Sequence, residues 1–190
     1  TYLYTGNDAS KTITNGIDLD GEGGLVWIKQ RDGSTQRHVL SDTERGTSKT
    51  LSSDRTDAEF TSTTRVTSFN SDGFDLGSSS QVNGDPNNYV SWSFKKEPSF
   101  FDVVTYTGDG VAGRTVSHNL GTTVGTIIVK RTDATREWGV YHRSLGGTQY
   151  LKLNDVNQVN SAIGFWNNTE PTSTGFTVGV SNTTNASGAT

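Results

Sequence analysis

The sequence predicts an all-β protein built from two tandem antiparallel β-sandwich repeats of jelly-roll-like form. The first observation is an internal duplication, in which a segment of about a hundred residues occurs twice with few insertions. The second is a series of short segments rich in β-branched and aromatic residues and separated by Gly, Asn, Asp and Ser. The third is composition: 30 % of the 190 residues are hydrophobic and 22 are glycine, which suits many short strands joined by turns.

The duplication sets the expected domain boundaries. Residues 4–7, 24–29, 46–51 and 71–77 return as residues 106–109, 125–130, 147–151 and 173–179. We therefore expect one repeat over residues 1–96 and a second over residues 97–190, joined at the charged, proline-containing segment 95–99. A single larger sandwich made of two pseudo-equivalent halves is the alternative.

The same register predicts that the second repeat lacks its last strand. Asn83 matches Asn185 and Asn88 matches Thr190, and the alternating run at residues 89–94 has no counterpart. A sandwich without that strand exposes a row of unpaired backbone groups, which recruits another strand. We therefore expect the place to be filled by residues beyond Thr190 or by a neighbouring subunit, for example by its residues 1–5.

Strands account for nearly all the structure that the pattern predicts. In the first repeat they are expected at residues 1–5, 11–14, 24–29, 37–40, 47–51, 65–69, 74–76 and 88–94. In the second repeat they are expected at residues 102–106, 115–117, 126–131, 137–142, 149–153 and 176–180. One helical turn is expected at residues 56–59, where Thr56 could cap the first amides.

Two nearly continuous apolar runs, residues 25–28 and 126–129, are expected to be core strands, either buried on both faces or central in their sheet. On this interpretation Trp27, Ile28, Ile127, Ile128 and Val129 all belong to the core. Trp92, in the other aromatic run of the first repeat, is expected to be buried as well.

Several classes of function are disfavoured by composition. Sixteen Lys and Arg are spread among twenty acids for a net charge of −4, so no basic face for nucleic acid is expected. No apolar stretch approaches the length of a membrane span, so no membrane insertion is expected. The chain has no cysteine and its three histidines lack metal-ligand spacing, so neither a metal site nor a cofactor is expected.

Catalysis is not expected either. The carboxylate pairs Asp18 with Asp20 and Asp57 with Glu59 could face a groove, as glycosidase acids do, but the second repeat has no equivalent pairs. We assign these acids to turns and solvated edges and name no catalytic residue. A glycan hydrolase remains the third of the functional interpretations.

Aromatic residues peculiar to the second repeat are the better clue to binding. Trp138 and His142 share one face of an alternating segment, and Trp166 precedes Asn167 and Asn168 in what looks like an exposed loop. An indole ring can stack on a pyranose while amides bind its hydroxyls. We therefore expect any glycan site to use either Trp166 with Asn167 and Asn168, or Trp138 with His142. The alternative is that both tryptophans pack internally.

The chain also resembles a known group of proteins. The phrases at residues 24–29, 71–77, 89–94, 112–121, 140–146 and 185–190 are similar to a tandemly repeated domain of virion and tail-associated proteins from cyanophages and other marine bacteriophages. In that family the domain often lies beside lectin-like, concanavalin-A-like modules, and copies like the second repeat continue into a further strand. The resemblance implies a structural or adhesive virion protein and supplies no catalytic residue.

The expected function follows from the resemblance and from the composition together. We expect a non-enzymatic phage virion component, part of a tail fibre or another surface appendage, that self-associates in a symmetric or fibrous assembly. The alternative is a carbohydrate-binding module for host surface glycans. The expected location of the protein is the virion, at the surface of the extracellular particle.

Overall fold

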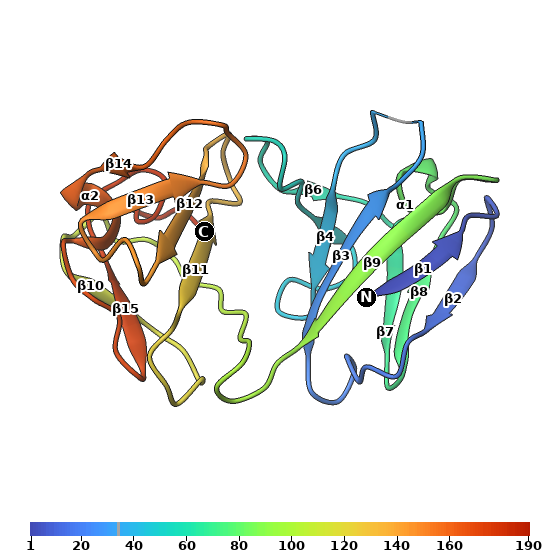
Figure 1. Cartoon of the computed structure of the whole chain (residues 1–190), viewed down its shortest axis with the longest axis horizontal. Helices are drawn as coiled ribbons and strands as arrows, with labels where there is room; N and C mark the ends of the chain where they lie inside the picture. The colour runs from blue at the N-terminus through green and yellow to red at the C-terminus, as the bar shows by residue number, and fades with distance from the viewer. Residues whose placement is uncertain (34) are drawn as a thin grey trace. The chain divides into compact units, whose positions relative to one another are not determined.

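The computed structural model describes residues 1–33 and 35–190 (Figure 1). Strands account for 35 % of the structure and helices for 4 %, and all the paired strands are antiparallel, so the all-β prediction is confirmed. The chain divides into two compact units, of which unit 1 comprises Thr1–Ser53 and Glu59–Glu97, and unit 2 comprises Asp54–Ala58 and Pro98–Thr190. The chain thus passes into unit 2 within the expected linker, but five residues of the first repeat also belong to unit 2.

Unit 1 contains two larger sheets. The first has four strands in the order β1 (Tyr2–Thr5), β9 (Asn88–Lys95), β3 (Gly24–Gln30) and β4 (Val39–Asp42). The second has three strands in the order β2 (Lys11–Thr14), β8 (Gly73–Leu76) and β7 (Val66–Asn70). The pair β5 (Lys49–Thr50) and β6 (Phe60–Thr61) and the short helix α1 (Ser80–Asn83) complete the unit.

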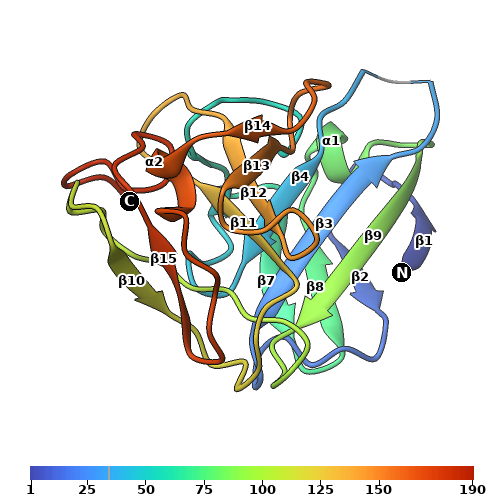
Figure 2. The ribbon, with the colours of Figure 1, turned by 60° about the vertical axis from the view of Figure 1, so that its left-hand side comes forward.

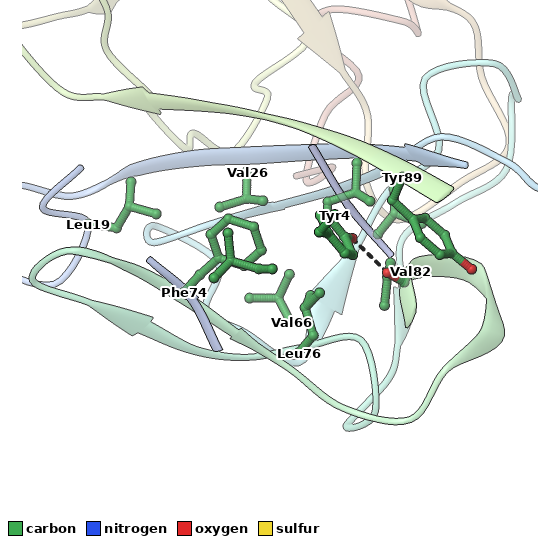
Figure 3. Packing of buried hydrophobic residues seen from close by; sticks show 11 residues of the cluster. Tyr4, Leu19, Val26, Val66, Phe74, Leu76, Val82 and Tyr89 are labelled. Atoms are coloured by element: carbon green, nitrogen blue, oxygen red, sulfur yellow. Dashed lines mark hydrogen bonds between the residues drawn. The ribbon is translucent and has the colours of Figure 1, made fainter. Parts of the chain in front are cut away.

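The two sheets of unit 1 share one apolar core. Val26 and Tyr89 come from the sheet that holds β9, whereas Val66, Phe74 and Leu76 come from the other sheet (Figure 3). Tyr4 stacks on Tyr89 with ring centroids 5.2 Å apart. Burying these side chains between two half-polar sheets is the main stabilising contribution that such a layered arrangement makes.

Of the two alternatives for the first apolar run, β3 has the central position in its sheet and is not buried on both faces. Exposure alternates along β3, with Val26 and Ile28 fully buried and Trp27 only partly covered on the opposite face. On that face the Trp27 ring packs edge-to-face against Trp92, and its Nε1 donates to His38 Nδ1 at 2.8 Å. The apolar run therefore reflects a core face plus an aromatic cluster on the outer face.

Unit 2 repeats part of this arrangement. Its four-stranded sheet has the order β11 (Thr126–Lys130), β12 (Trp138–His142), β13 (Gln149–Lys152) and β14 (Asn160–Ser161). A second sheet pairs β10 (Arg114–Ser117) with β15 (Gly175–Val178), and helix α2 (Ile163–Trp166) lies between β14 and β15 in the chain. A separate core cluster includes Val116, Tyr141, Trp166 and Phe176.

Several local predictions for unit 2 are also wrong. Residues 102–106 form no strand, because no β9-like strand lies beside them within the described residues. Ile128 is 45 % exposed, since it faces away from the core and has no aromatic neighbour like Trp92. Residues 56–59 are not helical, and the two short helices lie elsewhere.

One buried asparagine in each unit holds distant backbone segments together. In unit 1, Asn83 Nδ2 lies within hydrogen-bond distance of Asn7 Oδ1, Ala9 O and Gly77 O. In unit 2, Asn185 Nδ2 contacts Asp109 Oδ1, Val111 O and Gly179 O at 3.1, 3.0 and 2.8 Å. The equivalence extends to the backbone amides of Asn7 and Asp109, which donate to the asparagine Oδ1 at 3.1 and 3.0 Å.

These asparagines give the first testable prediction. We expect Asn83→Ala and Asn185→Ala each to lower the free energy of unfolding by about 2–3 kcal/mol, because buried carbonyls lose their donors. Denaturant unfolding monitored by hydrogen exchange of each unit measures the change. Asn157→Ala, at an exposed position, is the matched control and should change the free energy of unfolding little. Equal effects of the buried and exposed substitutions would contradict a structural role for the asparagines.

Candidate functional site

The expected glycan-binding residues occupy very different environments. Trp166 lies on α2 and is 1 % exposed, so the expectation that it sits in an exposed loop is wrong. Its ring meets Tyr141 and Phe176 edge-to-face at centroid distances of 6.0 and 6.5 Å. Such packing shows that Trp166 fills the core of unit 2, and its ring has no free face for a sugar.

Trp138 is likewise internal. It is 4 % exposed at the start of β12, and its Nε1 donates to Arg55 O at 2.9 Å. The nearby Arg136 N–H donates to Thr56 O at 2.8 Å. These two bonds explain why the segment Asp54–Ala58 belongs to unit 2.

The three polar residues of the predicted site are more accessible. His142 and Asn168 are exposed, and Asn167 is partly exposed at the left-handed C-cap of α2, with φ of 53°. His142 Nδ1 accepts the Ser144 amide at 3.2 Å, which fixes a turn. Polar groups for sugar hydroxyls are therefore present, but the stacking ring that the prediction required is not exposed at either tryptophan.

A polar hollow that the sequence interpretation missed lies in unit 1. It has a volume of about 420 Å³ and is lined by Gln30, Asp32, Gly33, Gln36 and Asn87. Asp32 follows β3, and the hollow therefore sits where β3 ends beside the start of β9. The sequence interpretation did not single out Asp32, because its equivalent Asp133 makes it look like one more residue of the duplicated scaffold.

The carboxylate of Asp32 is held ionised by its neighbours. The Asn88 backbone amide donates to both carboxylate oxygens, at 3.0 and 2.9 Å, and Asn88 Nδ2 donates at 2.7 Å. These bonds lower the pKa of Asp32 below its ordinary value. In unit 2 the equivalent Asp133 instead pairs with Arg131 at 2.6 Å, so the two aspartates have different partners.

Two of the four acids considered for catalysis bond to neighbouring groups of unit 1. Asp18 Oδ1 accepts the Gly21 amide at 2.8 Å. Glu59 pairs with Arg45 at 2.8 Å and with Lys49 at 3.3 Å. Among the described residues, no group of three or more His, Asp or Glu side chains is placed to hold a metal ion.

Glu170 in unit 2 links three segments of chain. Its Oε2 accepts Tyr141 Oη at 2.6 Å, and its Oε1 accepts the Gly147 amide at 2.7 Å. These donors, led by Tyr141, lower the pKa of Glu170. Burial, followed by the bond to Glu170, raises the pKa of Tyr141 to about 12.

The hydrogen bond between Tyr141 and Glu170 predicts that the stability of unit 2 depends on pH. A carboxylate whose pKa is depressed on folding stabilises the fold above its ordinary pKa of 4.5, and this stabilisation is lost as the pH falls through the folded-state value. We expect the difference in melting temperature between the parent and Glu170→Gln to be largest above about pH 5 and to shrink in more acidic buffer. A difference that stays constant from pH 7 to pH 3 would contradict this role.

A family model described as a domain of unknown function (DUF7483) matches residues 1–190. The chain belongs to this family. The DUF7483 match spans both units, and neither the curated proteins nor the solved structures gave a match. No helix formed by residues 1–33 and 35–190 is long and apolar enough to cross a membrane.

Proposed function

We propose that this DUF7483 chain is a non-enzymatic structural and adhesive component of a phage virion, built from two tandem β-sandwich repeats and located in a tail fibre or other surface appendage. Its self-association in the particle is part of the proposal. The resemblance stated above suggests the setting. Separate core clusters in the two units support two sandwiches over one larger sandwich.

The observation that carries the proposal is the nature of what was duplicated. Both units retain the buried asparagine network and a tyrosine that donates to a backbone carbonyl, Tyr4 to Val82 O at 2.6 Å and Tyr106 to Thr184 O at 2.5 Å. Groups that could contact a ligand, such as those around Asp32, differ between the units. Duplication of the scaffold without duplication of a site is what a structural module requires.

A second candidate function, recognition of a host surface glycan, is favoured by the hollow beside Asp32. An ionised carboxylate with Gln30, Gln36 and Asn87 around it offers both acceptors and donors for sugar hydroxyls. In this candidate function the binding residues are those that line the hollow in unit 1, in place of the two buried tryptophans. The hollow is open and its lining includes no aromatic residue, which makes weak binding the expectation.

Mass spectrometry and immunogold labelling of purified particles from a phage that encodes this chain would test the first candidate. We expect the chain at stoichiometric copy number and gold on an external appendage. Its detection only in the soluble lysate would overturn the virion proposal.

A glycan array tests the second candidate. Glycan binding that is lost in Gln36→Ala and Asn87→Ala but kept in Asn168→Ala would support a binding site at the hollow. No glycan binding by the parent chain would remove this candidate function.

A further inference from the structure

A buried arginine in unit 1 forms no ion pair with an acid of residues 1–33 and 35–190. Arg65, directly before β7, is 9 % exposed. Its Nη2 donates to Gln81 Oε1, and its guanidinium carbon lies 4.1 Å from the centre of the Phe60 ring. Its Nη1 is buried and has no hydrogen-bond partner in the described part of the chain. Burial, followed by the like charge of Arg37, lowers the pKa of Arg65 to about 10, so the group is charged at neutral pH.

Two buried hydroxyls share the side of the strands that carries the Phe60 ring. Thr50 is the cross-strand partner of Phe60, so their side chains lie on one face of the β5–β6 pair. The bridge between β4 and the residue after β5 places Ser41 opposite Thr50 on the same face. Neither Ser41 Oγ nor Thr50 Oγ1 has a hydrogen-bond partner within the described residues. Three unpartnered donors therefore lie on one side of unit 1, where β4 and β7 end their sheets (Figure 2).

Two carboxylates adjacent in the chain to these groups are engaged by other cations. Asp42 and Glu59 both pair with Arg45, at 2.5 and 2.8 Å. Glu59 also pairs with Lys49 at 3.3 Å. The guanidinium of Arg65 is thus left buried without a counter-charge, which is unfavourable because its lost hydration is not compensated.

The equivalent positions of unit 2 show that the scaffold does not require this buried charge. Strand pairing and equivalent backbone hydrogen bonds match the three positions with aromatic residues: Ser41 with Tyr141, Thr50 with Tyr150 and Arg65 with Phe165. In unit 2, Tyr150 stacks on Phe165 with ring centroids 3.7 Å apart. Apolar replacement of buried charges is often neutral or stabilising, so an arginine kept here points to a ligand of opposite charge.

We propose that Arg65, Ser41 and Thr50 bind one small anion of the size of chloride inside unit 1. All three side chains can donate hydrogen bonds, which is what an anion requires. Their unpartnered atoms are closed to solvent, which suits an enclosed ion and not the carboxylate of a sugar or a peptide. The inference goes beyond the proposed function, because the ion would stabilise unit 1 in any setting of the protein.

Thermal unfolding of the full chain in sodium chloride and in sodium gluconate of equal ionic strength tests the inference. The two salts screen charges equally, but gluconate is too large for an enclosed site. We expect the melting temperature of unit 1 to rise by about 4 °C or more for each tenfold increase in chloride above its dissociation constant. We expect no such rise in gluconate.

Thr50→Val distinguishes a bound anion from an unused hydroxyl, because valine has a similar shape and no donor. We expect this variant to bind chloride at least ~10-fold more weakly than the parent, since one hydrogen bond to the ion is lost. In gluconate it should melt at or above the temperature of the parent, because a buried hydroxyl without a partner is removed. Arg136→Met, which removes an exposed arginine, is the matched control and should keep the parent's response to chloride.

Crystals grown in sodium bromide would locate the ion directly by anomalous scattering. We expect one bromide within hydrogen-bond distance of Arg65 Nη1 and Thr50 Oγ1. A water molecule or an acid of the chain at that place would overturn the inference. So would equal melting temperatures in chloride and gluconate, or the same affinity for chloride in Thr50→Val as in the parent.

Discussion

Gly24→Ala is expected to destabilise unit 1 by about 3 kcal/mol or more, whereas Gly125→Ala at the equivalent position of unit 2 is expected to have little effect. A Cβ on Gly24 would lie 2.1 Å from Phe94 O, a backbone atom of the part of β9 that pairs with β3. The side chain of Leu19 would also be 2.8 Å away. Relief of this clash requires separation of β3 from β9.

A Cβ on Gly125 meets a different neighbour. The nearest atom is Arg143 Nη2 at 2.8 Å, the end of a flexible side chain that can move aside. Gain of an alanine Cβ also reduces the conformational freedom of the unfolded chain, which offsets part of any cost. Thermal unfolding together with hydrogen exchange of each unit would measure the loss of stability that each glycine substitution causes. Similar losses from both substitutions would contradict the view that the backbone neighbour of Gly24 and the flexible side-chain neighbour of Gly125 decide the cost.

Trp166→Ala is expected to destabilise unit 2 by about 3–5 kcal/mol, the usual cost of removing a large buried aromatic side chain. The ring is fully buried among Tyr141, Phe165 and Phe176. Its truncation leaves a cavity at the point where α2 meets the sheet pair β10 and β15. Denaturant titration of the parent and the variant gives the difference in free energy.

Trp166→Phe is the informative control. Trp166 Nε1 is buried and has no hydrogen-bond partner within residues 1–33 and 35–190, so its loss costs no bond there. The phenyl ring retains part of the aromatic packing, and the loss should therefore be about 1–2 kcal/mol. Full stability of Trp166→Ala combined with loss of glycan binding would instead restore Trp166 to an exposed binding role.

The residue matches between the two halves of the sequence are reflected in local structure. Matching residues such as Tyr4 with Tyr106 and Asn83 with Asn185 proved to have matching hydrogen bonds. Strand positions were largely predictable because β-branched runs alternate with turn residues. The two-residue strands β6 and β14 were missed, since so short a segment carries no period.

Burial and binding were harder to derive. Trp27 and Ile128 lie in continuous apolar runs, yet each faces away from the core, and a run without alternation does not reveal which face is covered. Trp166 was placed in a loop because polar residues follow it, although the side chain turns inward from α2. The hollow at Asp32 depends on Asn87 and Asn88, which are remote in sequence and are brought to Asp32 only by the pairing of β9 with β3.

Amide hydrogen exchange of the chain tests most directly the central claim, that each unit has its own core and is held by its own buried asparagine. The amides of Asn7 and Asp109 donate to Asn83 Oδ1 and Asn185 Oδ1, and they therefore report on the two units separately. We predict that Asn185→Ala speeds exchange of the Asp109 amide by at least about 100-fold and leaves the Asn7 amide protected. Equal loss of protection at both amides would contradict the account.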